Sequence, residues 1–377
     1  MPLKEESTSY TLDTTTTPIR GAERGSARTG PFPRLDFEFP GRCDHFVINV
    51  RMGRKLRLGL IGTGIAAREL YLPALEPLKA RIQIVACASR RRDKAEAYAK
   101  LAGVPLVVDR AEDLIRLPEV DAIVISLPID RQPAYVLRAL SAGKPVLSEK
   151  PIAPSLAAGK KLVKAAARFD VPWLVGENFA FMPHVRRLRG WLEDGRLGDV
   201  RLVEAVQATW MDSKNRYFHT PWRHQRKFDG GFVSDGGVHL ANVVRSCFGL
   251  PTHMTGFTAH FERALPPPDT AVAALRFGSG ALGTWTSCFS ARYSGPMLRV
   301  FGSKANAELR YGDVTLESAK GKRTTYAARS NSFTEEFKHF ADVVQRGVPL
   351  ALTPSEALDD LRLIDGLLRS PRGALAR

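Results

Sequence analysis

Short apolar runs alternate with stretches of helical spacing between residues 55 and 176, and this alternation constrains the fold more than any other feature of the chain. The apolar runs lie at 56–61, 82–88, 105–108, 122–126, 146–148 and 173–175. Helical spacing occurs between them, for example at 65–78, 93–101, 133–142 and 156–169. Continuous apolar strands separated by helices are typical of a parallel sheet that helices bury on both faces. Residues 54–176 are therefore predicted to form a doubly wound α/β domain of the Rossmann type.

A different pattern begins after residue 176, where longer alternating strands are joined by tight turns. Strands are predicted at 202–211, 271–277, 281–287, 298–301, 307–311 and 314–316, and the Gly278-Ser279-Gly280 turn indicates a hairpin. Helices are predicted at 183–193, 235–248, 333–345 and 354–368. Residues 177–377 are therefore predicted to form an α+β domain with one large open, mainly antiparallel sheet and helices on one face.

The first 53 residues differ in composition from the rest of the chain. Four consecutive threonines, Thr14 to Thr17, precede a stretch rich in Gly, Ser, Arg and Pro at 21–33. We expect residues 1–53 to be a disordered or non-native extension, with Met52 as the natural start, because such a composition buries too little apolar surface to fold. Residues 1–54 hold eight Lys or Arg and seven Asp or Glu, so +15 of the net charge of +16 lies beyond them.

Composition argues against several classes of protein. No apolar run reaches the roughly 18 residues that a membrane-spanning helix requires. The four cysteines are scattered, which argues against a zinc site or a disulfide scaffold and favours a reducing cytoplasm. A net charge of +16 can attract nucleic acid or anionic membrane, but the charges are dispersed and no nucleic-acid-binding motif is present. We expect a cytoplasmic protein with no metal site and no nucleic acid or membrane partner.

A glycine-rich turn follows the first predicted strand. The sequence Gly62-Thr63-Gly64-Ile65-Ala66-Ala67 has GxGxxA spacing and opens the predicted helix at 65–78. In dinucleotide sites the first glycine allows a tight turn, the second lets the backbone approach a pyrophosphate, and the small third residue lets the helix pack closely on the sheet. Gly62, Gly64, Ile65 and Ala66 are therefore predicted to contact a dinucleotide, although glycines after a strand can also serve the turn alone.

The end of the second predicted strand indicates which dinucleotide binds. NAD is usually held there by a carboxylate that accepts from the ribose hydroxyl, but this strand ends in Ser89-Arg90-Arg91-Arg92. A hydroxyl followed by guanidinium groups suits a phosphate dianion, because arginine makes charge-assisted bidentate contacts with phosphate. We predict NADP rather than NAD, with Ser89 and Arg90 as its contacts. One or two of the three arginines can instead belong to a solvated helix start, since Asp93 follows them.

Two further clusters bear side chains of catalytic type. Lys150 follows the fifth predicted strand in Glu149-Lys150-Pro151, at the sheet edge where open α/β sheets bind ligands. Farther along, Asp235, His239 and Asn242 fall on one face of a predicted helix at about 100° per residue. Gly236 and Gly237 lie beside them and cost about 1 kcal/mol each relative to alanine, so we expect a ligand or another backbone to approach closely there.

In combination, these motifs resemble the Gfo/Idh/MocA family, the relatives of glucose-fructose oxidoreductase and inositol dehydrogenase. The match runs from about Lys55 to about Leu368 and rests on the GxGxxA turn, Glu149-Lys150-Pro151 and the Gly-Gly-x3-Asp-x3-His run from Gly230 to His239. The resemblance implies oxidation of a sugar or cyclitol, or carbonyl reduction, beside a nicotinamide.

The resemblance also assigns roles to individual residues. It implies that Lys150, Asp235 and His239 form the catalytic set and that Glu149 and Lys150 also border the cofactor. It further implies that the open sheet joins subunits into a homodimer or homotetramer. The position three residues after the histidine is commonly an Asp that contacts substrate hydroxyls, and here it is Asn242, so the hydroxyl pattern that is bound can differ.

The residue types suit reversible hydride transfer between a nicotinamide and a secondary alcohol or ketone. A histidine that titrates near neutrality can accept the hydroxyl proton or, in reverse, donate it, so His239 is the predicted acid/base. Lys150 would stabilise the negative charge that develops on the reacting oxygen. Asp235 would orient a substrate hydroxyl or the imidazole.

Substrate contacts are predicted from a polar aromatic loop at 217–223 and from the end of the sixth strand. Trp222 and Arg223 suit a carbohydrate or polyol that can carry an anionic group, although this loop could equally be an oligomer contact. Asn178 is the predicted substrate contact near the sixth strand.

Two alternatives within the resemblance are an NAD-dependent glycosidase, which the missing ribose carboxylate disfavours, and a non-enzymatic nucleotide sensor. A sensor has no need of a proton-transferring Lys150, Asp235 and His239, so these residues argue against it.

Overall fold

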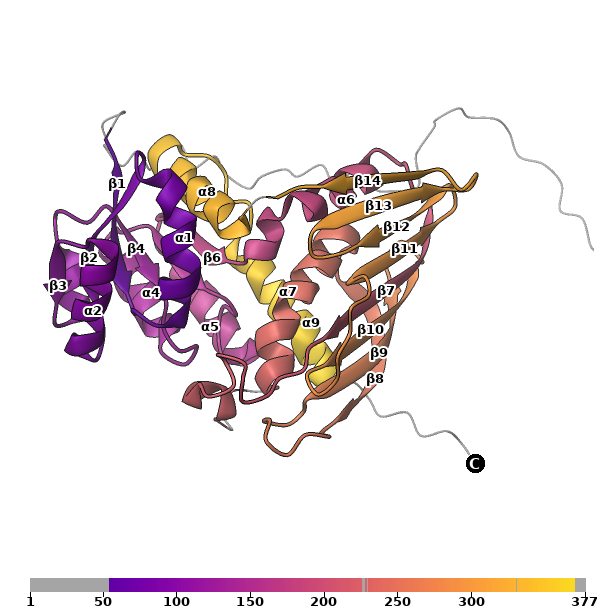
Figure 1. The fold of residues 1–377 in the computed structure, drawn as a ribbon, viewed down its shortest axis with the longest axis horizontal. Helices are drawn as coiled ribbons and strands as arrows, with labels where there is room; N and C mark the ends of the chain where they lie inside the picture. Colours follow the sequence, from indigo (N-terminus) through magenta and orange to yellow (C-terminus); the bar gives the residue numbers. More distant parts are fainter. Residues whose placement is uncertain (1–53, 226–227, 229, 330, 370–377) are drawn as a thin grey trace, which may run out of the picture. The chain divides into compact units, whose positions relative to one another are not determined.

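The computed structural model describes residues 54–225, 228, 230–329 and 331–369 (Figure 1). The predictions for residues 1–53, including Met52 as a natural start, lie outside this part of the chain.

The predicted parallel sheet is confirmed. Its strands run in the order β3-β2-β1-β4-β5-β6, and every neighbouring pair is parallel. They are β1 (Leu56–Ile61), β2 (Ile82–Ala88), β3 (Leu106–Val108), β4 (Ala122–Ile125), β5 (Val146–Glu149) and β6 (Trp173–Gly176). The order reverses between β1 and β4, which is where sheets of this type bind ligands at the carboxyl ends of their strands.

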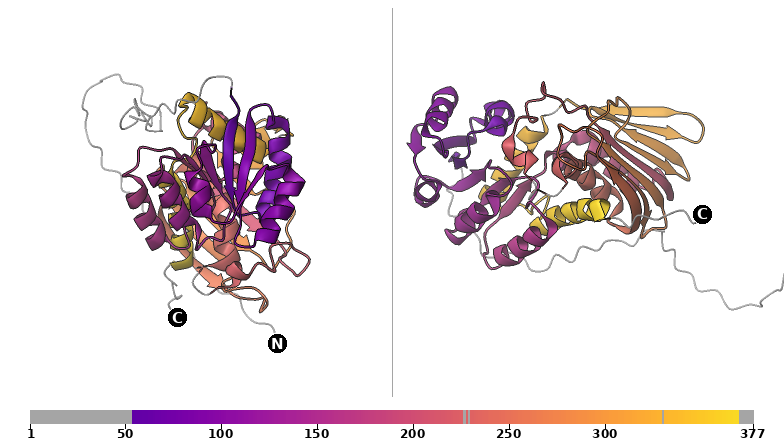
Figure 2. Two further views of the ribbon diagram at one scale, coloured as in Figure 1. Left: turned by 90° about the vertical axis from the view of Figure 1, so that its left-hand side faces the viewer. Right: turned by 90° about the horizontal axis from the view of Figure 1, so that it is seen from below.

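Helices cover both faces of this sheet (Figure 2, left). They include α2 (Arg92–Ala102), α4 (Gln132–Ser141) and α5 (Leu156–Ala166), close to their predicted bounds. The helix predicted at 65–78 is divided into a π-helical segment η1 (Ala67–Tyr71), α1 (Leu72–Leu75) and a 3₁₀ turn η2 (Glu76–Leu78). Pro73 and Pro77 account for these divisions, since proline lacks the N–H that a regular α-helix needs. The short α3 (Ala111–Arg116) was not expected, because six residues show no clear helical period.

The second sheet has eight strands and is mainly antiparallel, as predicted. Its order is β14-β13-β12-β11-β7-β10-β9-β8, and β7 and β10 form the parallel pair within it. The strands are β7 (Val200–Ala208), β8 (Pro251–Ala259), β9 (Thr270–Phe277), β10 (Leu282–Cys288), β11 (Leu298–Gly302), β12 (Ala305–Leu309), β13 (Asp313–Ser318) and β14 (Arg323–Ala327). The edge strands β8 and β14 were not predicted. Most of their residues are exposed or half-buried, so they lack a strict apolar alternation.

Helices α6 (Pro183–Glu193), α7 (Gly231–Phe248) and α9 (Pro354–Arg369) pack on one face of this sheet (Figures 1 and 2). On the opposite face of β8, β9 and β10, the apolar side chains of Phe257, Val272 and Leu282 are exposed by 57%, 40% and 50%. Phe257 and Val272 are directly opposed across β8 and β9. Part of this face is therefore apolar and uncovered in the single chain.

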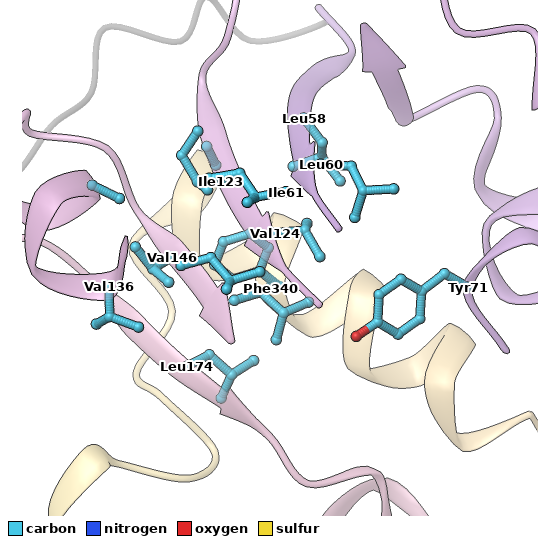
Figure 3. Packing of buried hydrophobic residues seen from close by; sticks show 14 of the residues in the cluster. Leu58, Leu60, Ile61, Tyr71, Ile123, Val124, Val136, Val146, Leu174 and Phe340 are labelled. Carbon is cyan, nitrogen blue, oxygen red and sulfur yellow. The ribbon is translucent and has the colours of Figure 1, made fainter. Parts of the chain in front are cut away.

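Helix α8 (Ser332–Arg346) belongs to the C-terminal part of the sequence, but it packs in the core of the parallel sheet. Its Phe337 and Phe340 are fully buried, and Figure 3 shows Phe340 beside Val124 and Val146. The apolar core of the first domain is thus completed by residues far beyond the predicted boundary at 176. Among the described residues, no helix is both long and apolar enough to cross a bilayer.

Candidate active site

The carboxyl ends of β5 and β6 face helix α7. Glu149 and Gly176 are paired in register at the ends of these adjacent parallel strands. The residues that follow them, Lys150 and Glu177, therefore leave the sheet side by side. Each then bonds to a different residue of α7, and the two partners are four positions apart, about one helical turn.

Lys150 pairs with Asp235, a contact that the sequence did not predict, and the imidazole of His239 bonds to another carboxyl group. Its Nζ lies 3.1 Å from Oδ1 of Asp235 and donates to the backbone carbonyl of the same residue at 2.7 Å. The other carboxylate oxygen of Asp235 accepts from Nε of Arg223 at 2.7 Å. Burial by itself would raise the pKa of Asp235, but the adjacent charges of Lys150 and Arg223 outweigh it and hold this pKa well below its usual range. Asp235 is therefore an ionised carboxylate held between two cations.

Arg223 comes from the short 3₁₀ turn η4 (Pro221–His224) and is 8% exposed. Its guanidinium carbon lies 4.1 Å from the centroid of the Trp222 ring and 4.8 Å from that of Tyr217. Two aromatic rings thus lie beside the guanidinium, and its ion pair with Asp235 joins the 217–223 loop to α7. Arg223 therefore contacts Asp235, one of the predicted catalytic residues. The spacing of the sequence did not predict this contact.

His239 bonds to Glu177, a pairing that the sequence did not predict. Nδ1 of His239 lies 2.6 Å from Oε1 of Glu177, a carboxyl group whose residue is only 1% exposed. A carboxylate acceptor places the imidazole proton on Nδ1 and leaves Nε2 as the free base. The ring of Phe179 stacks on the imidazole at 4.5 Å between centroids and 15° between planes. The carboxyl group and the stacked ring together hold the imidazole of His239 in this orientation.

More ionisable groups surround these two pairs. Tyr71 of η1 donates to Oε1 of Glu149. Burial raises the pKa of Glu149, and burial together with the negative charges of Glu149 and Glu177 raises the pKa of Glu336 in α8 far more. Glu336 is 2% exposed, and this burial is the main reason why its pKa lies well above the usual range of a carboxyl group.

Helix α7 begins four residues earlier than predicted, at Gly231, with Gly230 in the left-handed region at φ 78°. No other backbone approaches Gly236 or Gly237 among the described residues, and their near neighbours are side chains. A Cβ at Gly236 would lie 2.6 Å from the ring of Phe289, and one at Gly237 would lie 3.1 Å from Ile364. Close packing of side chains against α7 therefore explains both glycines.

The glycine-rich turn has room for a dinucleotide. Gly62 has φ 98°, and a Cβ there would lie 2.1 Å from the carbonyl oxygen of Ser126 at the end of β4. A Cβ at Gly64 would meet nothing within 4 Å, so the exposed side of the turn is open. Ile65 and Ala66 are half-buried beside it, and Ala67 is fully buried against the sheet. These residues fit the backbone cradle that a pyrophosphate requires.

Of the three arginines after β2, two have acidic partners. Arg91 pairs with Asp93 at 2.5 Å, and Arg92 pairs with Glu96 at 2.8 Å and also with Asp109. Arg90 is exposed and has no ion pair among the residues that the structure describes. Its guanidinium, beside the half-buried Ser89, is therefore the one of the three best able to bind an added anion.

The predicted substrate contacts occupy different environments. Trp222 is half-buried beside Arg223. Asn178 is 7% exposed and donates to Oγ of Ser332 at 2.9 Å. Asn242 is 1% exposed and donates to Asp360 of α9, which also accepts from Arg245. Asn242 therefore bonds away from His239 and Asp235, although all three lie on one helix. No cluster of three or more His, Cys, Asp and Glu suited to a metal occurs in the described part of the chain.

Two family models match the sequence. One, described as an oxidoreductase family with an NAD-binding Rossmann fold, matches residues 56–177, and the other, described as a GFO/IDH/MocA C-terminal domain, matches residues 185–308. An oxidoreductase from Thermotoga maritima is 34% identical with a TM-score of 0.80, and the match covers 84% of this chain and 97% of that one.

Two further relatives have named activities. Trans-1,2-dihydrobenzene-1,2-diol dehydrogenase from Bos taurus is 26% identical over 326 residues, which cover 81% of this chain and 94% of the bovine protein. Aldose-aldose oxidoreductase from Caulobacter crescentus shares the fold, with a TM-score of 0.74 at 22% identity over 84% of this chain and 97% of that one. With both halves of the chain matched by models of one family, the protein belongs to the Gfo/Idh/MocA family of NAD(P)-dependent oxidoreductases.

Proposed function

We propose that this protein transfers hydride between NADP and a secondary alcohol or ketone of a sugar, sugar derivative or polyol. The observation that carries the proposal is the double pairing at α7, in which Lys150 bonds Asp235 and Glu177 bonds His239 one turn later. An amine and an imidazole thereby flank the carboxyl edge of the nucleotide-binding sheet. The diol and aldose specificities of the two relatives named above support a polyhydroxylated substrate.

His239 acts as the acid/base. With its proton held on Nδ1 by Glu177, Nε2 can take the hydroxyl proton of the substrate during oxidation and return it during reduction. The positive charge that the ring then gains is stabilised by the buried carboxylate of Glu177. The stacked Phe179 keeps the ring from rotating away from the substrate.

Lys150 stabilises the reacting oxygen. Its ammonium donates two of its three protons to Asp235, to the backbone carbonyl and to the carboxylate, and the third remains for a substrate oxygen. Asp235, with Arg223 behind it, sets the position of this ammonium and balances its charge. A bound nicotinamide supplies the hydride chemistry itself. Glu149 and the turn at Gly62 to Ala66 would hold the cofactor.

The preference for NADP rests on Arg90 and Ser89. Because Arg91 and Arg92 are already paired with carboxylates, Arg90 is the guanidinium that can approach a 2′-phosphate at the end of β2.

The uncovered apolar face of β8, β9 and β10 supports self-association. Exposed Phe257, Val272 and Leu282 would be buried if two copies met through this face, in a homodimer or within a homotetramer. Molar mass measured by light scattering, for the protein and for a Phe257→Glu variant, tests this: we expect at least a dimer that the substitution weakens.

A substrate panel tests the activity. Sugars, polyols, inositols and sugar phosphates are each assayed with both nicotinamide cofactors by absorbance of the reduced nicotinamide. We expect turnover of at least one of them, with higher kcat/KM for NADP(H) than for NAD(H). Absence of turnover across all four classes would contradict the proposed function.

A further inference from the structure

Two adjoining hollows lie at one end of the eight-stranded sheet, outside the residues assigned to catalysis above. Because β7 and β12 both run antiparallel to β11, the end of β7, the start of β11 and the end of β12 meet at the same edge. The smaller hollow has a volume of about 190 Å³ and the larger about 530 Å³. Ala208, Tyr293, Ser294 and Tyr311 line both, so the two hollows are continuous.

The smaller hollow adjoins the catalytic helix. Gln207, which lines it, donates to the carbonyl of Gly236 at 3.1 Å, next to Asp235. Tyr311 packs edge-on against Phe179 at 5.8 Å, and Phe179 is the ring that stacks on His239. Two aromatic rings, those of Phe179 and Tyr311, would therefore separate the smaller hollow from a substrate that Lys150 and His239 hold.

Each hollow has one arginine and at least two aromatic rings in its lining. Arg310 lines the smaller one and Arg292 the larger one, and the residues that line them include no Asp or Glu among those the structure describes. Trp210, Tyr293 and Tyr311 are exposed by 41%, 39% and 63%. The five residues Trp210, Arg292, Tyr293, Arg310 and Tyr311 form what we call the arginine–aromatic shelf.

Arg292 and Arg310 differ in the hydrogen bonds and ion pairs that their guanidinium groups already form. Arg310 bonds Glu308 at 3.4 Å and the carbonyl of Ser294. Arg292 forms no ion pair with any described residue, and its guanidinium carbon lies 5.8 Å from the ring centroid of Trp210. A guanidinium in this state, beside exposed ring faces and away from carboxylates, suits a carboxylate or phosphate oxygen.

We propose that the arginine–aromatic shelf binds an anionic group on a second ring of the substrate, beyond the ring that is oxidised or reduced. The substrate class is then an acidic saccharide of at least two units rather than a neutral monosaccharide. The ring faces of Trp210 and Tyr293 cover the apolar face of the second sugar, and Arg292 binds its carboxylate or phosphate. The inference rests on the proposed function, because it assigns the reacting ring to Lys150 and His239.

Three matched disaccharides test the shelf. They share the same methyl glucoside, which has no free aldehyde for NADPH to reduce, and the same linkage, and they end in glucose, in glucuronate or in glucose 6-phosphate. Each is titrated calorimetrically into the full-length protein saturated with NADPH, where both partners are reduced and no turnover occurs. We expect at least one of the anionic disaccharides to bind about tenfold or more tightly than the neutral one, the gain from one charge-assisted contact. The stronger of the two binders identifies the anion.

Variants distinguish binding at the arginine–aromatic shelf from nonspecific attraction of an anion to the positively charged protein. Arg292→Ala should remove most of the tenfold preference, whereas Arg263→Ala, which removes an exposed arginine outside the shelf, should retain it. Trp210→Ala should weaken all three disaccharides. Equal affinities for all three, no binding of either anionic disaccharide, or a preference that persists in Arg292→Ala would each overturn the proposal. Because binding is read without turnover, this result is independent of whether hydride transfer is observed.

Discussion

The imidazole of His239 and the carboxyl group of Glu177 are joined by a 2.6 Å contact, although 62 positions separate them in the chain. Glu177 follows β6 and His239 lies near the middle of α7, so this contact ties the parallel sheet to the helix that carries the predicted acid/base.

Glu177→Gln should lower kcat without unfolding the protein. The amide cannot stabilise the charge that His239 gains, so we expect a loss of roughly tenfold to a hundredfold, part of the 10²–10⁴ that general acid/base catalysis contributes. Steady-state kinetics and NADPH titration provide the test. Glu335→Gln is the control, because this carboxyl group lies in α8 and pairs with Lys338 rather than with His239. Unchanged kcat in Glu177→Gln would argue against the assigned role of this carboxyl group.

Glu336→Gln should change how stability depends on pH. The raised pKa of Glu336 means that it keeps its proton to a higher pH in the folded state than in the unfolded state, where it ionises above about pH 4.5. The folded state then binds the extra proton, so its stability falls with rising pH, by at most about 1.4 kcal/mol per unit from this group. Urea unfolding at pH 5 and pH 8 should show a smaller decline in Glu336→Gln than in the unaltered protein. Identical declines would mean that Glu336 ionises normally in the fold.

Arg90→Ala should weaken NADPH binding far more than NADH binding. Loss of one charge-assisted contact of about 1.5–3 kcal/mol corresponds to roughly 10- to 100-fold in Kd for NADPH. Arg91→Ala is a matched control, because Arg91 already pairs with Asp93. Titration by nicotinamide fluorescence measures all four constants. Equal losses for both cofactors, or equal effects of the two substitutions, would contradict the assignment of Arg90 to the 2′-phosphate.

Gly236→Ala and Gly190→Ala should change stability in opposite directions. A Cβ at Gly236 would lie 2.6 Å from the Phe289 ring, and we expect this overpacking to cost about 1–3 kcal/mol. A Cβ at Gly190 in α6 would meet nothing within 4 Å, so alanine there should gain about 0.5–1 kcal/mol from its helix propensity. Both free energies of unfolding come from urea titration. A stabilised Gly236→Ala variant would show that Phe289 moves away freely.

Much of the fold could be predicted from the sequence, because its strands are buried on both faces and its glycines mark the first turn. The bounds of β1 to β6 agree with prediction to within one residue at each end. The edge strands β8 and β14 escaped prediction since they bury few side chains. The packing of α8 against the first domain also escaped it, because an amphipathic helix does not reveal which sheet its apolar stripe will cover.

The candidate site could be predicted only in part. The position of Lys150 after β5 and the four-residue spacing of Asp235 and His239 are local features, and the structure brings Lys150 and Asp235 together. The contact of Glu177 with His239 and that of Arg223 with Asp235 depend on how distant elements pack, which spacing does not encode. Asn242 shares the helix face of Asp235 but bonds to Asp360, because α9 packs on that part of α7.

The fifth prediction concerns Lys150 and His239 and tests hydride transfer most directly. The rate of NADPH oxidation or NADP reduction is measured for Lys150→Met and His239→Asn with the best substrate of the panel, beside the exposed controls Lys161→Ala and His253→Ala. We predict that both site variants lose at least about a hundredfold in kcat, the lower part of the range for acid/base and electrostatic catalysis, while they still bind NADPH and the controls remain active. Full activity of either site variant would contradict the proposed mechanism.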